Sequence, residues 1–194
     1  MIDIRSPHEI QYSLMTREHY HAFGGIIHGF ARIEVGLQMT LAAITGIDAG
    51  KLAIITRGLS YAARRDTLYS YMEIVEIDED FKARVKGFFD AVHEYSGLRN
   101  HIAHSLWTKG IRPNTIRPLS VRVQGGKGRF YGLPDSNDVR DYTLEELGNI
   151  ALKLAIIHNS HVTFLRTSGL IDSIDEKIRA SIEESTSAGG TEDK

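Results

Sequence analysis

Apolar residues recur early in the chain with the spacing of a long helix. From Thr16 to Thr45 they follow one another at steps of three and four, which is typical of one buried stripe. The stripe consists of Phe23, Ile26, Ile27, Phe30, Ile33, Leu37, Leu41 and Ile44. Glycines in the same segment lower its helix propensity, so we expect another helix to pack closely against it. These glycines are Gly24, Gly25, Gly29 and Gly36.

Three more helices are predicted before the chain changes character at Gly110. The first is short and covers residues 51–59, and Ser60 then caps a second helix that ends near Val75. Asp78 caps the third, a long helix over Glu79–Trp107 with apolar residues throughout.

A β-hairpin is predicted at about residues 112–133. This segment combines two prolines with alternating apolar residues and a glycine-rich turn over residues 124–128. After it, Thr143 and Glu146 have the spacing of a capping box, which opens a helix that ends near Thr167.

These elements predict an all-α fold in the main. We expect a four- to five-helix bundle with the β-hairpin inserted before the last long helix. The bundle forms a single domain over residues 1–184, in which a polar amphipathic segment, 172–184, follows the last long helix. Residues 185–194 are rich in Ser, Gly and Thr, and we expect this tail to be disordered.

Composition narrows the possible classes of function. The chain has 194 residues, 42% of them hydrophobic and 25% charged, which is ordinary for a globular protein. Its formal net charge of −2 provides no global field that would attract nucleic acid or a membrane. The absence of cysteine excludes disulfides, thiolate catalysis and cysteine-ligated zinc. No apolar run approaches the ~20 residues of a membrane span, and the charged N-terminal region does not resemble a signal peptide, so we expect a cytoplasmic protein with no membrane partner.

Two charged residues fall on faces that the helical pattern predicts to be buried. Arg99 lies in the middle of the apolar face of the predicted long helix, and Glu34 lies within the stripe of the first helix. Since a lone buried charge is unfavourable, we expect Glu34 and Arg99 to meet inside the bundle. Two other interpretations stay open: the pair is purely structural, or Arg99 extends its guanidinium to water.

Arg99 begins a set of side chains that suits phosphate chemistry. Asn100 and His104 are four residues apart and share one flank of the helix, and His93 lies on that flank as well. A guanidinium can hold a phosphate, an imidazole can act as general acid or base near neutral pH, and an amide can orient either group. These are the groups needed to cleave RNA without a metal, through attack of the 2′-hydroxyl on the adjacent phosphorus.

The sequence Arg99-Asn100-His101-Ile102-Ala103-His104 resembles the HEPN motif, in which an Arg, usually followed by a polar residue, precedes a His with four to six residues between. Here four residues intervene, and Asn100 takes the polar position. Residues 30–34 and 98–107 further resemble uncharacterised bacterial HEPN-like proteins of about this length. The resemblance covers about residues 16–167 and agrees with a helical bundle that carries the motif on a late helix.

The resemblance implies a metal-independent endoribonuclease, typical of toxin–antitoxin systems, that acts as a homodimer with its two motifs facing one cleft. Arg99 would stabilise the charge on the phosphorane, His104 would act as general acid and base, and Asn100 would position the reacting groups. Glu34 would hold Arg99 in place, as its helical phase indicates. RNA and an antitoxin protein are the implied partners. The alternative is a non-catalytic helical module that binds nucleotide or a protein partner.

Basic residues gather around the motif and the predicted hairpin. No acidic residue lies between Glu94 and Asp135. The candidates for contacting an RNA backbone in this interval are Lys109, Arg112, Arg117, Arg122, Lys127 and Arg129. The alternative is a solvated hairpin that happens to be basic.

Two histidine pairs, His101/His104 and His158/His161, have an i, i+3 spacing that can bring two imidazoles near one ion. Neither pair encloses a carboxylate that would complete a metal-binding signature, so we expect no metal site and no cofactor. His158 and His161 lie on the apolar side of the last long helix and are interpreted as core histidines, although His158 could approach the motif. His101 is expected to face solvent or a partner subunit.

Overall fold

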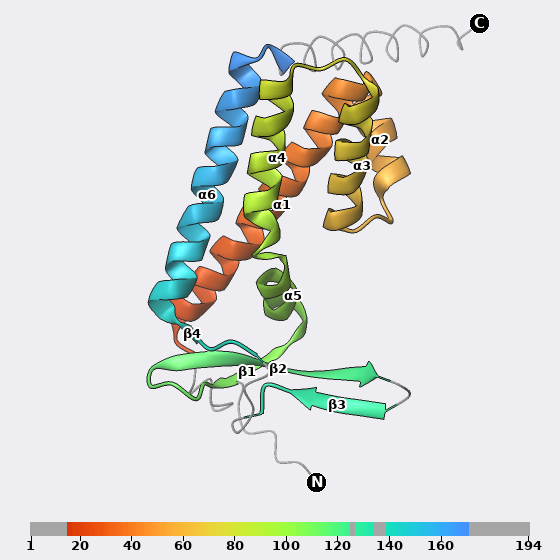
Figure 1. Ribbon diagram of the computed structural model, residues 1–194. Helices are drawn as coiled ribbons and strands as arrows, with labels where there is room; N and C mark the ends of the chain where they lie inside the picture. Colours follow the sequence, from red (N-terminus) through yellow and green to blue (C-terminus); the bar gives the residue numbers. More distant parts are fainter. Residues whose placement is uncertain (1–14, 125–126, 134–138, 171–194) are drawn as a thin grey trace, which may run out of the picture. The chain divides into compact units, whose positions relative to one another are not determined.

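A computed structural model describes residues 15–124, 127–133 and 139–170. Over these residues the protein is mainly α-helical, with a small antiparallel sheet before the last long helix, as the apolar pattern predicts (Figure 1). The helices are α1 (Arg17–Thr45), α2 (Ala49–Thr56), α3 (Tyr61–Ile74), α4 (Glu79–His93), α5 (Ser96–His104) and α6 (Leu144–Thr167). The strands are β1 (Leu106–Lys109), β2 (Thr115–Gln124), β3 (Lys127–Tyr131) and β4 (Tyr142–Thr143). The predicted amphipathic segment, 172–184, and the predicted tail, 185–194, lie outside the described residues.

The chain clusters into two compact units, each built from two stretches of sequence. The first unit combines Met1–Phe30 with Glu94–Ala155, and the second combines Ala31–His93 with Ile156–Lys194. Helices α1 and α6 therefore contribute residues to both units, whereas α5 and the sheet belong to the first. The expectation of a single domain over residues 1–184 stays a prediction.

Strand β2 is the centre of the sheet in the first unit. It pairs antiparallel with β1, where Leu106 lies opposite Leu119, and with β3, where Ser120 lies opposite Tyr131. Its first residues also pair with β4, which leads directly into α6. The predicted hairpin is thus present as β2 and β3, and two further short strands extend it into the sheet drawn in Figure 1.

The long helix predicted over Glu79–Trp107 is wrong, because the chain divides it into three elements. Helix α4 ends at His93, a turn follows, and α5 begins at Ser96 without a side-chain cap on its Tyr95 N-cap residue. Ser96 and Gly97, which directly follow the break, have lower helix propensity than the residues around them. The helical phase cannot be carried across this break, and Leu106, an apolar residue within the predicted long helix, is 75% exposed in β1.

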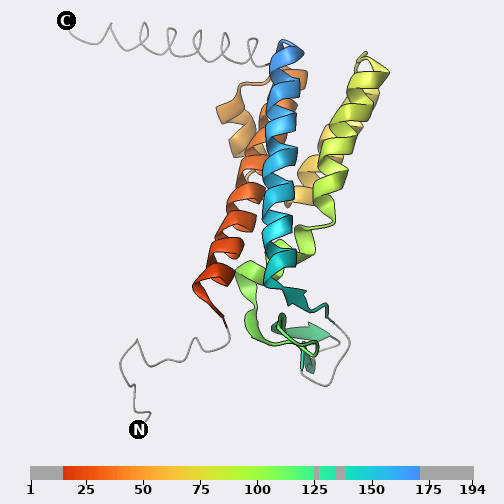
Figure 2. The same cartoon turned by 90° about the vertical axis from the view of Figure 1, so that its left-hand side faces the viewer.

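The close helix packing predicted from the glycines of α1 is confirmed in the first unit, where α1 and α6 lie side by side (Figure 2). A Cβ atom added at Gly25 would lie 3.1 Å from the Cβ of Ala151, and one at Gly29 would lie 3.0 Å from the Cβ of Leu154. Gly24 does not take part, since a Cβ there would meet nothing within 4 Å.

The second unit contains the caps that the sequence predicts. Ser60 accepts a hydrogen bond from the Ala63 N–H at the start of α3, and Asp78 accepts one from the Phe81 N–H in α4. The predicted short helix, α2, begins earlier than expected, because Asp48 caps it by accepting from the Lys51 N–H.

Candidate functional site

Helix α5 carries the whole motif within one short element of the first unit. It covers Ser96–His104, and the Ser105 N–H closes its last turn on the carbonyl of His101 at 2.9 Å. Strand β1 begins directly after this cap. The motif therefore occupies the last two turns of a helix that is fixed to the sheet at its C-terminal end.

Arg99 and Asn100 contact each other through their side chains. Arg99 Nη1 donates a hydrogen bond to Asn100 Oδ1 at 3.2 Å. Arg99 is half-buried and Asn100 is exposed. This contact orients one N–H group of the guanidinium, a side chain that carries five N–H donors and can pair with phosphate.

His104 is exposed at the last position of α5. Its spacing of four residues from Asn100 places both side chains on one flank of the helix. His101, which we expected to face solvent or a partner, is half-buried, and its Nδ1 lies 3.2 Å from Ser105 Oγ. Of the two motif histidines, His104 is thus the more accessible.

The three supporting residues predicted from the sequence belong to the second unit. Glu34 is half-buried on α1, His93 is exposed at the end of α4, and His158 is half-buried on α6. The pairing of Glu34 with Arg99, which belongs to the first unit, stays a prediction, and so does an approach of His158 to the motif.

Arg117 is a structural residue of the sheet, not part of an exposed basic surface as predicted. Its side chain is 1% exposed, and its Nε lies 3.1 Å from Asp141 Oδ1. It also donates hydrogen bonds to the carbonyls of Leu133 and Val139 at 2.9 and 2.7 Å. Burial raises the pKa of Asp141, but the Arg112 N–H, the Arg117 charge and the Thr115 hydroxyl together hold that pKa below its ordinary value.

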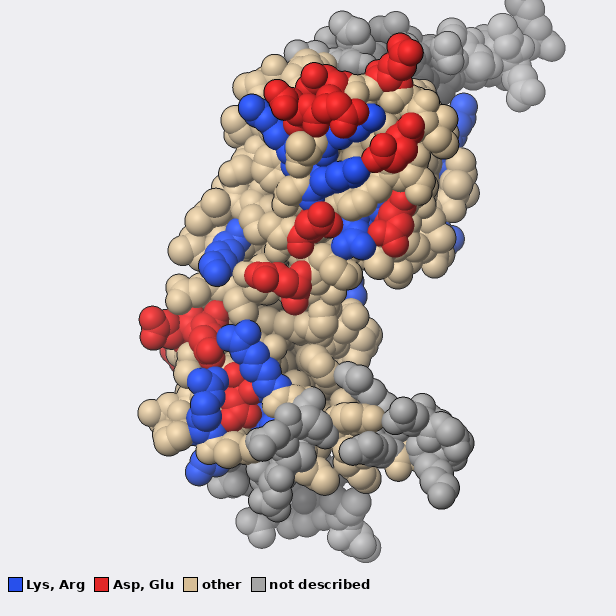
Figure 3. Space-filling view, in the orientation of Figure 1, with Lys and Arg blue, Asp and Glu red and all other residues tan. Residues whose placement is uncertain are grey.

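The other predicted RNA-binding residues have different surroundings. Lys109 is exposed on β1 and has no side-chain partner among the described residues. Arg112 donates to the Asp141 carbonyl at 2.7 Å and to Glu146 at 3.3 Å. Side chains of Arg122, Lys127 and Arg129 lie outside the part of the chain that the structure describes. On the face drawn in Figure 3, basic and acidic side chains are interspersed.

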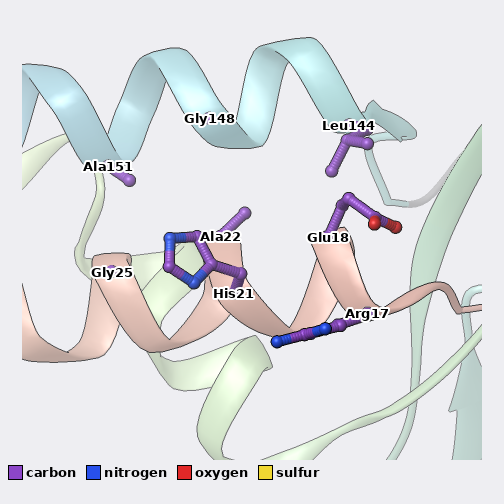
Figure 4. Close-up of a pocket in the computed structure, with 8 residues that line it drawn as sticks. All are labelled: Arg17, Glu18, His21, Ala22, Gly25, Leu144, Gly148 and Ala151. Atoms are coloured by element: carbon purple, nitrogen blue, oxygen red, sulfur yellow. The ribbon is translucent and has the colours of Figure 1, made fainter.

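A cavity of about 490 Å³ lies between α1 and α6 in the first unit (Figure 4). Small residues line it from both helices, Ala22 and Gly25 from α1 and Ala151 from α6, and Figure 4 shows Glu18 of α1 opposite Leu144 of α6. A hydrogen bond with Thr16 lowers the pKa of the exposed Glu18 carboxyl. This cavity contains none of the residues predicted for the site.

A second cavity, of about 440 Å³, begins at the first turn of α5. The side chains that give it its chemistry are Tyr95, Arg140, Tyr142, Glu146, Asn149 and Lys153. Burial and a hydrogen bond to Glu94 raise the pKa of Tyr95 to about 12. No sequence signal indicates this set, because β4 and α6 bring it to α5 only through the pairing of β4 with β2.

Two more observations bear on the class of protein. Among the described residues, no group of three or more His, Cys, Asp or Glu side chains is arranged to hold a metal ion. No single described helix has the length and apolar character needed to cross a membrane; α1 and α2 together meet that test by length and composition, across a bend of 116°.

Comparisons of the chain with protein-family models, with curated proteins and with solved structures give no match. The function is therefore inferred from the residues and their geometry.

Proposed function

We propose that the protein is a metal-independent endoribonuclease of the HEPN type. The observation that carries the proposal is the motif on α5: Arg99 and Asn100 are hydrogen-bonded to each other, and His104 is exposed on the same helix flank as Asn100. A guanidinium that can bind phosphate and an exposed imidazole thus lie on one short helix.

The reaction requires only groups of this motif and of the RNA. The 2′-hydroxyl attacks the adjacent phosphorus while an imidazole removes its proton, and the bond from phosphorus to the 5′-oxygen breaks as that oxygen gains a proton. Arg99 stabilises the negative charge that grows on the phosphoryl oxygens, and Asn100 holds the guanidinium in position. The products are a 2′,3′-cyclic phosphate and a 5′-hydroxyl end.

In this proposal the enzyme acts in the cytoplasm as a homodimer, and it is a toxin that an antitoxin protein neutralises. A dimer would supply a second His104, so that one imidazole removes the proton and the other donates one. Growth arrest on expression, relieved by His104→Ala, is the cellular outcome that this role requires.

Cleavage of RNA by the purified protein tests the catalytic proposal. Single-stranded RNA is incubated with the wild type, Arg99→Ala and His104→Ala in the presence of EDTA, and the ends of the products are identified. We expect each variant to lose at least ~100-fold in rate, as general acid–base and electrostatic contributions do.

His28→Ala is the matched control, because His28 is an exposed histidine of α1 in the same unit. It should cleave like the wild type, and RNA with a 2′-deoxy position at the cleavage site should remain intact. Equal activity in all the proteins, or cleavage of the deoxy substrate, would contradict the proposal.

A non-catalytic module that binds nucleotide is the second candidate. The half-buried position of Arg99 favours it, since an arginine of the protein interior is often structural. This candidate predicts no cleavage by any of the proteins and a loss of folding stability in Arg99→Ala.

A further inference from the structure

The cavity at the start of α5 contains polar groups without a partner among the described residues. These are the side-chain amide of Asn149, the ammonium of Lys153 and the hydroxyl of Tyr142. Asn149 and Lys153 are four residues apart on α6, so both project from one face of the helix. Three different hydrogen-bonding groups thus surround a space of about 440 Å³, which is large enough for a nucleotide.

One wall of this cavity is a stack of a guanidinium on a ring. The Arg140 guanidinium carbon lies 5.1 Å from the centre of the Tyr142 ring, and Arg140 Nη2 donates to Glu146 Oε1 at 3.2 Å. Glu146 is itself held by the Thr143 N–H at 2.7 Å, so the stack is fixed to the first turn of α6. Guanidinium planes and aromatic rings are the surfaces on which unpaired RNA bases stack.

The charges of the cavity suit a ligand that has both an anionic group and hydrogen-bond donors. Arg140 and Lys153 attract an anion, whereas Glu94 and Glu146 line the same space and repel one. Carboxylates accept hydrogen bonds from hydroxyl and amino groups. A ribonucleotide satisfies both requirements, since its phosphate suits the cations and its ribose hydroxyls or base amino groups suit the carboxylates. Inorganic phosphate satisfies only the first.

The cavity and the catalytic motif share one helix. Leu98 lines the cavity and directly precedes Arg99, and the Arg99 N–H donates to the carbonyl of Tyr95 at 2.9 Å. We propose that this cavity is a nucleotide pocket that binds one ribonucleotide of single-stranded RNA beside the cleavage position. The inference rests on the proposed function for its biological role, but the binding itself can be measured without cleavage.

Binding is measured on the His104→Ala protein, in which the proposed cleavage is blocked. A short fluorescein-labelled single-stranded RNA is titrated by anisotropy with this protein and with the same protein carrying Asn149→Ala and Lys153→Ala. Both added changes are at exposed positions of α6, and circular dichroism checks that the helices are retained. We expect the pocket changes to raise Kd about fivefold or more.

Lys51→Ala in the His104→Ala protein is the matched control, since Lys51 is an exposed lysine of α2 in the second unit. It should leave Kd unchanged. Equal RNA affinity with and without the two pocket changes would overturn the nucleotide pocket.

A second experiment distinguishes a free nucleotide from a nucleotide within an RNA strand as the ligand. Adenosine 5′-monophosphate and inorganic phosphate are each titrated into the protein, and NMR follows the chemical shifts of the amides around Asn149 and Lys153. Shifts with the mononucleotide indicate a pocket for free nucleotides as well as RNA; their absence, together with the loss of RNA affinity, indicates binding within a strand alone. Shifts with inorganic phosphate at lower concentration than with the mononucleotide would overturn the inference.

The two proposals fail separately. If the wild type cleaves no RNA but the pocket changes still weaken RNA binding, the catalytic proposal fails and the pocket stands. If the wild type cleaves RNA and the pocket changes, made in the wild type, leave both RNA affinity and KM unchanged, the pocket fails and the catalytic proposal stands.

Discussion

Two glycines of α1 have different surroundings although the same helix contains both. A Cβ atom added at Gly36 would lie 2.9 Å from Nδ1 of His161, whereas one added at Gly24 would meet nothing within 4 Å. The His161 ring is buried against Phe88 and Phe89 and cannot move aside freely. The absence of a side chain is therefore a packing requirement at Gly36 and only a weakness of the helix at Gly24.

Alanine at these two positions should change stability in opposite directions. Gly36→Ala should lower the free energy of unfolding by about 1 to 2 kcal/mol, because overpacking outweighs the gain in helix propensity. Gly24→Ala should raise it by roughly 0.5 to 1 kcal/mol, since only the propensity changes. Urea unfolding measures both, and a change of the same sign in the two variants would contradict the close contact at His161.

Arg117 shows at the same scale what the sequence could not reveal. It lies in a strand beside Pro118, and a basic residue in a polar, alternating strand is ordinarily exposed. Its burial depends on Asp141 and on the carbonyls of Leu133 and Val139, all distant along the chain. Arg99 and Asn100, by contrast, are neighbours, and their place in one helix follows from local sequence.

At the scale of elements, the start of α6 depends on a reciprocal pair of hydrogen bonds. The Glu146 N–H donates to Thr143 Oγ1 at 3.0 Å, and the Thr143 N–H donates to Glu146 Oε2 at 2.7 Å. The sequence predicts this capping box, and the structure confirms it. Glu146 also pairs with Arg112 and Arg140, so the helix cap and the wall of the nucleotide pocket share one carboxylate.

Loss of the Thr143 hydroxyl should therefore weaken the first turn of α6. Thr143→Ala should cost about 1 kcal/mol of unfolding free energy and speed hydrogen exchange of the amides after it. Thr67→Ala, which removes an exposed hydroxyl bonded to the Ala63 carbonyl within α3, should cost less. Equal losses of unfolding free energy in the two variants would contradict a stabilising role of the capping box.

Local signals predicted most of the helices, and the errors occurred where longer-range contacts decide. The caps at Ser60 and Asp78 and the hairpin are each encoded within a few residues. The end of the predicted long helix is not encoded locally. Trp107 belongs to β1 and packs on Phe23 and Tyr142, whose ring centres lie 4.6 and 6.1 Å away. The pocket beside α5 depends on the same kind of contact and could not be predicted.

At the scale of the whole molecule, His161 connects stability to pH. It is buried in the second unit, where Thr40 donates its hydroxyl to the Gly36 carbonyl at 2.8 Å and lies 3.1 Å from His161 Nε2. The Thr40 oxygen can therefore accept a hydrogen bond from Nε2–H of His161. Burial, with a smaller effect of His158, lowers the pKa of His161 to about 4.

Stability should fall as the solution is acidified from about pH 6.5 to about pH 4. In this window the unfolded chain protonates position 161 whereas the folded protein does not, so protons favour unfolding. This one group contributes a slope of up to about 1.4 kcal/mol per pH unit. His161→Gln keeps a hydrogen-bond donor for Thr40 and cannot titrate. Its free energy of unfolding, measured by chemical unfolding at several pH values between about 6.5 and about 4, should therefore fall less steeply with acidification. Parallel curves for the two proteins would contradict a buried neutral histidine.

The contact of α1 with α6 restricts how the sequence can diverge. Because the backbone at Gly25 approaches Ala151 within the space of a methyl group, and Gly29 approaches Leu154 in the same way, neither partner can enlarge alone. In descendants that keep this fold, a larger residue at 25 must be accompanied by a smaller one at 151. Such compensated exchanges would make these four positions covary, and a set of diverged sequences would reveal this helix pairing even where no other similarity survives.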